Sequence, residues 1–153
     1  MVCIPEKASS EIPNDFDLSA EYKAGYSDWA SWKVTITGDG RAFQEIHDFR
    51  KPVPIQKSFS LSQDDLQELL RRIKESDIFT ILESDVTCDD FRTCGDFLII
   101  TLTMNAKSHR VQVYDPAHVK DKEGVQRFLK VWSEVLRKVP SPNAEQTADL
   151  YGL

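Results

Sequence analysis

The chain has 153 residues, of which 41% are hydrophobic and 29% charged, which is typical of one soluble domain with an ordinary core. Its 25 acidic and 19 basic residues give a formal charge of −6, which argues against nucleic acid or an anionic membrane as a partner. The sequence lacks an apolar run of ~18 residues, a secretory-signal pattern and a disulfide framework, so we expect a cytoplasmic protein.

The N-terminal third predicts an arm followed by three strands. Residues 1–15 contain two prolines and no hydrophobic period, which favours a flexible arm. Residues 16–23 alternate apolar and polar side chains, as strands do. Residues 32–37 and 41–47 flank Gly38-Asp39-Gly40, and an Asp-Gly pair supplies the positive φ angles of a tight hairpin.

The next segment predicts an edge strand and then a helix. Pro52 and Pro54 exclude a central strand but allow a short edge strand at residues 55–59. Residues 60–63 (Ser-Leu-Ser-Gln) resemble a capping box, in which Gln63 reaches back to the first backbone N–H. An amphipathic helix should follow and end near Ser76 or Asp77, with its apolar face made of Leu66, Leu69, Leu70 and Ile73.

The C-terminal half repeats this order. Residues 83–96 are polar and predict a loop, whereas residues 97–104 are nearly all apolar and predict a covered strand. A turn at residues 105–107 should return the chain along residues 109–114. A second amphipathic helix is expected at residues 121–138 and ends before Pro140.

These elements predict a two-layer α+β sandwich. A hairpin followed by a helix occurs twice, which indicates pseudo-duplicated hairpin–helix units. We therefore expect the two hairpins side by side, forming with the strand at residues 16–23 an antiparallel sheet of five to six strands with both helices on one face. The single domain should span residues 16–139, followed by a flexible tail at residues 140–153.

The acidic loop at residues 83–96 is the first candidate site. Aligned as a calcium loop, it offers Asp85, Asp89 and Asp96, but Asp90 stands where a glycine is required. A metal-dependent or small hydrolytic enzyme built on these carboxylates is one hypothesis, and a solvated surface loop is the plainer interpretation. Cys88 and Cys94 lie in the same loop and allow a minor hypothesis of a thiol redox switch, although acidic neighbours raise the pKa of a thiol.

Aromatic residues mark a second candidate site. Tyr26 and Trp29 lie among Gly, Ser and Asp and are suited to an exposed binding contact. The sequence contains no phosphate-binding loop and no hydrolase or metalloprotease motif, so we expect no cofactor and no resident metal. It favours a non-catalytic binding or protein-interaction module over an enzyme. A protein partner or a second copy would bind at an open sheet face, at the loop at 83–96, or at the edge strand at 55–59.

The segment Trp32 to Phe43, with its Thr-Gly-Asp-Gly turn and the helix that follows, resembles bacterial domains of unknown function. Those domains have a strand, a Thr-x-x-Gly-Asp-Gly turn, a return strand and a helix that opens with Ser or Thr. The resemblance covers about fifty residues and implies a small bacterial α+β domain. It implies no activity, cofactor or site residue.

Overall fold

Six strands and two helices make up the fold in a computed structural model, which describes residues 12–24, 31–48, 51–81, 96–114, 116 and 122–139. The elements are β1 (Asp17–Lys23), β2 (Ser31–Thr37), β3 (Arg41–His47), β4 (Ile55–Ser60), α2 (Gln63–Ser76), the short 3-10 helix η1 (Ile78–Thr80), β5 (Phe97–Met104), β6 (Lys107–Tyr114) and α3 (Glu123–Lys138).

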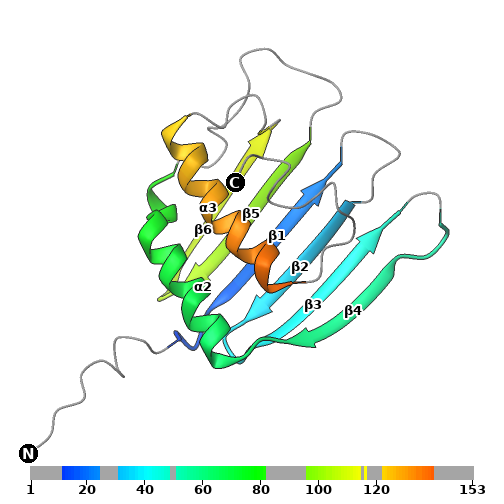
Figure 1. Cartoon of the computed structure of the whole chain (residues 1–153), viewed down its shortest axis with the longest axis horizontal. Helices are drawn as coiled ribbons and strands as arrows, with labels where there is room; N and C mark the ends of the chain where they lie inside the picture. The colour runs from blue at the N-terminus through cyan, green and yellow to red at the C-terminus, as the bar shows by residue number, and fades with distance from the viewer. Residues whose placement is uncertain are drawn as a thin grey trace, which may run out of the picture.

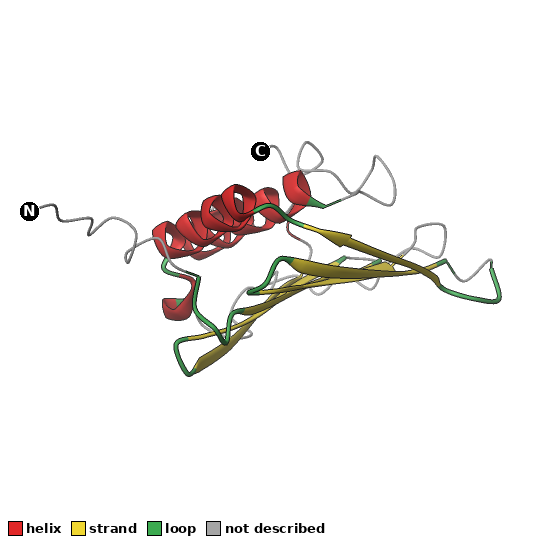
Figure 2. Ribbon diagram, turned by 90° about the horizontal axis from the view of Figure 1, so that it is seen from below, coloured by secondary structure: helices red, strands yellow, loops and turns green. Residues whose placement is uncertain are grey.

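The strands form one antiparallel sheet in the order β4-β3-β2-β1-β5-β6 (Figure 1). The first strand therefore lies at the centre, paired with β2 on one side and β5 on the other, and it separates the two hairpins. Figure 2 shows both long helices on one side of the sheet. The predicted two-layer α+β sandwich is confirmed.

Along each central strand, buried side chains that face the helices alternate with side chains on the open face of the sheet. Leu18, Ala20 and Tyr22 of β1 are buried under the helices, while the residues between them face the other way. The same alternation in β2 buries Trp32 and Val34. Successive residues of a strand point to opposite faces, so this register leaves one open face and one helix-covered face.

The β2–β3 loop and the start of α2 differ in detail from the sequence prediction. The β2–β3 connection is a three-residue loop, because Ile36 pairs with Ala42, and among the described non-helical turn residues of this hairpin only Gly40 has positive φ, at 89°. A side chain at Gly40 would also meet the Leu61 carbonyl oxygen at 2.7 Å. The N-cap of α2 is Ser62, whose Oγ accepts from the Asp65 N–H at 3.1 Å, whereas Ser60 belongs to β4. The predicted capping box at residues 60–63 is therefore wrong by two residues.

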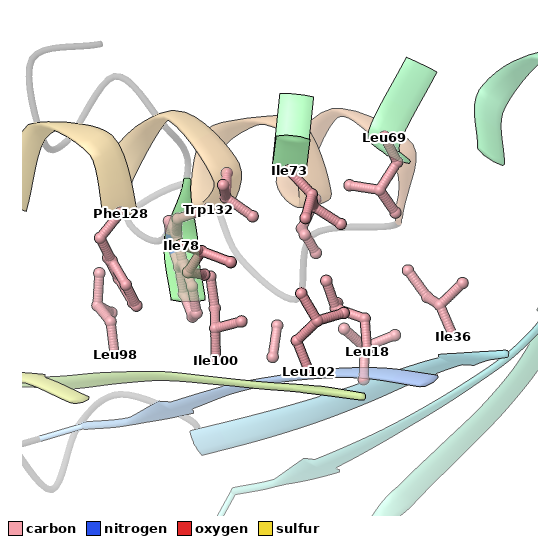
Figure 3. Close-up of a cluster of buried hydrophobic side chains, with 14 of the residues drawn as sticks. Leu18, Ile36, Leu69, Ile73, Ile78, Leu98, Ile100, Leu102, Phe128 and Trp132 are labelled. Atoms are coloured by element: carbon pink, nitrogen blue, oxygen red, sulfur yellow. The ribbon is translucent and has the colours of Figure 1, made fainter. Parts of the chain in front are cut away.

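The core lies between the helix layer and the covered face of the sheet. Figure 3 shows side chains from both helices pointing toward the strands, with Phe128 and Trp132 above Leu98 and Ile100. These side chains are at most 1% exposed. An aromatic row runs through the core, since the Trp32 ring stacks on Trp132 with centroids 5.4 Å apart.

The two helices run antiparallel and are joined by charged side chains at both ends. At one end, Arg127 donates to the Ser76 and Asp77 carbonyl oxygens, at 2.9 and 3.1 Å, where α2 ends. At the other end, the Lys138 ammonium lies 3.3 Å from Asp65 and 3.3 Å from Glu134, a residue 1% exposed. Burial lowers the pKa of Lys138, but hydrogen bonds to these carboxylates outweigh burial and raise it overall.

The chain ahead of β1 also belongs to the packed domain. Ile12 packs against the core, and the Asp15 carboxylate accepts from the Asn105 and Ala106 N–H groups at 2.8 and 2.7 Å. The described fold thus includes residues 12–15, ahead of the expected start at residue 16. No helix in the described part of the chain is long and apolar enough to cross a membrane.

Candidate functional site

Asp96 is the one predicted site residue that the structure describes. It lies just before β5, where its Oδ2 accepts from the Tyr22 hydroxyl at 2.8 Å. Tyr22 is fully buried and stacks on Trp32. The Asp96 carboxylate is therefore held by the hydroxyl of a buried core tyrosine. The described residues contain no group of three side chains that could hold a metal ion.

The other predicted site residues lie outside the described residues: Tyr26, Trp29, Asp85, Cys88, Asp89, Asp90 and Cys94. The metal, redox and aromatic-contact hypotheses built on them stay predictions.

The open face of the sheet is rich in hydroxyl groups. Ser19 on the central strand pairs with Thr35 on one side and Thr101 on the other, so the three lie in one row across the sheet. The Thr103 and Ser108 hydroxyl groups are 2.8 Å apart on the same face. These hydroxyl side chains are short, whereas Lys33 and Glu45 on the same face are long, so Phe43 lies between low and tall neighbours.

Phe43 pairs with Thr35 of β2 and Ser58 of β4, and its side chain is 43% exposed. A shallow hollow of about 680 Å³ surrounds it. Its lining comes from β2, β3, β4 and the turn after β2: Thr35, Thr37, Asp39, Arg41, Ala42, Phe43, Ser58, Phe59 and Ser60.

Two carboxylates near Phe43 are held in the ionised form: Asp39, which lines the hollow, and Glu45, which lies outside its lining on the same face of β3. The Thr37 hydroxyl and the Arg41 N–H donate to Asp39 at 2.6 and 3.1 Å, and both hydrogen bonds lower the pKa of Asp39. Hydrogen bonds from His47 and Gln56 lower the pKa of Glu45 in the same way. A carboxyl group with a lowered pKa is a poor proton donor near neutral pH, so the arrangement suits binding better than acid–base chemistry.

The edge strand next to this hollow carries the remaining exposed apolar side chains. Among the described residues, the exposed large hydrophobic side chains are Phe43, Val53 and Ile55, at 43%, 70% and 38% exposure. All three lie on β3, on β4 or just before β4. The predicted edge strand at residues 55–59 is confirmed as β4, which ends the sheet and pairs with β3 alone among the described strands.

Sequence reasoning missed Phe43, although a signal was present. The helix-facing residues of β3 are Ala42, Gln44 and Ile46, so Phe43 is an apolar residue in the polar phase of the strand. An aromatic residue out of phase with its strand marks an exposed contact. The signal needs the register as well, because only pairing with Ser58 shows that a small neighbour leaves the ring accessible.

Comparisons with known proteins add no assignment: no protein-family model matches the chain, and no curated protein matches it.

Proposed function

We propose that this chain is a non-catalytic binding module that takes an extended segment of a partner protein alongside β4. The observation that supports this most is the position of the exposed apolar side chains, which gather at the sheet edge whose outer backbone groups face no other described strand. Edge strands accept additional strands through backbone hydrogen bonds, and side-chain pockets on the two faces supply specificity.

The two faces of the edge would contact alternate side chains of such a segment. On the open face, Ser58 separates the incoming strand from Phe43, and a large apolar side chain can lean over this small residue into the hollow. On the helix side, Ile55 lies beside Ile46 and offers a second apolar contact. Side chains alternate along a strand, so apolar residues two positions apart would share a face.

Lys57 in the middle of β4 favours a foreign segment over a second copy of this chain. It is exposed, and two copies paired about Lys57 would bring like charges together, which is how native edge strands discourage self-pairing. A partner segment with an acidic residue opposite Lys57 would turn the same charge into an attraction. The proposal therefore commits to an extended, mixed apolar and acidic segment.

A displayed library of extended peptides tests the proposal. Wild-type protein should enrich peptides of this composition, and Phe43→Thr and Ile55→Thr should each weaken binding about tenfold, because a buried aromatic or aliphatic anchor contributes more than ~1 kcal/mol. Methylation of the peptide backbone nitrogens should also abolish binding. Arg110→Thr is the matched control, since Arg110 lies on the open face of β6 at the opposite edge.

Two results would count against the proposal. Enriched peptides that bind both β4-edge variants as well as wild type would place binding elsewhere. Light scattering that shows a dimer lost in both variants would assign the edge to a second copy instead of a foreign segment.

A further inference from the structure

We propose a second site, independent of the β4 edge: a groove between α2 and α3 that binds a phosphate group. The groove has a volume of about 320 Å³, at the lower end of the ~300–1,000 Å³ usual for ligand pockets. It is lined by four cations, one carboxylate and two serines: Arg72, Glu75, Ser76, Arg127, Lys130, Ser133 and Arg137. This concentration of positive charge occurs in a chain whose net charge is −6.

One of these cations is already used by the fold. Arg127 donates to the carbonyl oxygens that end α2 and to the Thr80 hydroxyl, and its Nε lies 2.7 Å from Glu123. It contributes charge to the groove, while most of its donors are engaged and only Nη2, whose contact with Glu123 is 3.5 Å long, remains weakly bonded. The binding groups must therefore come from the other cations.

The remaining cations keep donors available. The Arg72 guanidinium approaches Glu75 and Glu134 no closer than 3.6 Å, longer than a normal hydrogen bond. Arg137 has one hydrogen bond to Glu134, at 3.2 Å, and a guanidinium has five donors. The Lys130 ammonium has no ion-pair partner among the described residues.

One buried hydroxyl group in the groove wall points to a ligand. Ser133 is 3% exposed, and its Oγ has no hydrogen-bond partner among the described residues. The Arg72 Nε is also buried without a hydrogen bond among the described residues, but it faces the buried Glu134 carboxylate at 3.6 Å and is therefore not counted as a free donor. Buried polar groups are nearly always paired, and an unpaired one costs stability unless a ligand or water satisfies it.

The arrangement of donors fits a tetrahedral oxyanion. Arg72 reaches the groove from α2, while Lys130, Ser133 and Arg137 come from α3, so donors converge from two sides. A phosphate offers three or four acceptor oxygens in different directions and matches guanidinium forks, whereas a carboxylate offers two oxygens in one plane. We therefore assign the groove to a phosphate group, either as the free ion or on a small ester.

Thermal melting in inorganic phosphate tests this on the whole chain. At equal ionic strength, phosphate should raise the melting temperature of the wild type more than chloride does, and the shift should saturate, because a ligand of the native state stabilises it. Lys130→Gln removes an exposed ammonium and Ser133→Ala removes the unpaired hydroxyl. Each should weaken apparent phosphate affinity about tenfold, as expected for the loss of one charge-assisted hydrogen bond.

The controls separate binding from general charge effects. Lys74→Gln removes the same charge from the exposed surface of α2 outside the groove and should leave the phosphate shift unchanged. Ser133→Ala without phosphate should melt at or above the wild-type temperature, since it deletes an unpaired buried hydroxyl. This combination, intact folding with lost phosphate response, supports the site.

Three outcomes would overturn the site. The first is a melting temperature that phosphate raises no more than chloride does. The second is a phosphate-induced rise that persists in both groove variants or decreases equally in Lys74→Gln. A malonate shift as large as the phosphate shift would overturn the assignment to phosphate. A larger shift with either inorganic phosphate or glycerol phosphate supports the site and identifies the free ion or the ester.

Discussion

Single residues at turns connect distant parts of this sheet. The β5–β6 turn places Asn105 and Ala106 at positive φ, 53° and 64°, and both of their N–H groups donate to Asp15, just ahead of β1. One carboxylate thus stabilises the turn of the second hairpin from a segment far away in sequence. The turn combines a strained backbone with a charge-assisted contact.

Replacing Ala106 by glycine should stabilise the protein by about 0.5 kcal/mol. An alanine in the left-handed region costs ~1 kcal/mol, and the extra freedom of glycine in the unfolded chain cancels part of the gain. Chemical denaturation with Trp fluorescence measures the change, because Trp32 and Trp132 are buried. Lys107→Gly, in the first residue of β6, is the control and should destabilise, since residue 107 is not among those with positive φ. A loss of stability in Ala106→Gly would contradict the prediction.

Asp15 should contribute to the acid sensitivity of the fold. Hydrogen bonds from the Ala106 and Asn105 N–H groups lower its pKa below the usual 3.8. A lowered pKa means that the contribution to stability is fully present above the unfolded-state pKa of about 3.8 and is lost as the pH falls through the lower folded-state pKa. The free energy of unfolding should therefore fall less steeply between about pH 5 and about pH 3 in Asp15→Asn than in the wild type.

A matched control for this experiment is Asp17→Asn, which removes a carboxylate that accepts no hydrogen bond from the described residues. Its unfolding free energy at neutral pH should match the wild-type value, because no backbone N–H loses its acceptor. Equal slopes in wild type and Asp15→Asn would show that the turn does not depend on the charge of Asp15.

At the scale of elements, two nearby serines have different roles at the start of α2: Ser62 caps the helix, and Ser60 belongs to β4. Ser62→Ala should cost about 1 kcal/mol, because it removes the acceptor for the Asp65 N–H at the helix N-terminus. Ser60→Ala is the natural control, since Ser60 lies at the end of β4 and is exposed. Urea unfolding curves should show a lower midpoint for Ser62→Ala alone. An equal loss in both variants would favour the capping box that the sequence suggests.

Apolar spacing predicts each helix and its buried face, but it does not predict a site formed between two helices. Spacing of apolar residues located both helices and their buried faces, as with Leu69 and Ile73. The phosphate groove was missed because its donors come from two helices. Arg127, Lys130 and Arg137 share one face of α3, which is visible in the sequence, but their proximity to Arg72 follows only from the antiparallel packing.

At the scale of the whole molecule, the architecture was predictable because each strand and helix has a strong period and each turn a clear residue pattern. Strand order was not fully predictable, since alternation assigns faces and not neighbours. The hairpins were expected side by side, yet β1 lies between them. Phe43 illustrates the same limit at the candidate site, because its accessibility depends on the small Ser58 across the β3–β4 pair.

The central place of β1 has a consequence for synthesis on the ribosome. The N-terminal strand emerges first, but its second neighbour is β5, so Tyr22 must wait for Leu98 before the sheet is complete. Until β5 is made, one edge of β1 is unpaired in the nascent chain, and α2 lacks its companion helix for longer still, until α3 follows β6. Such exposed edges and apolar surfaces invite aggregation during slow, non-local folding. Protection by a chaperone would therefore matter from the synthesis of α2 until α3 is complete.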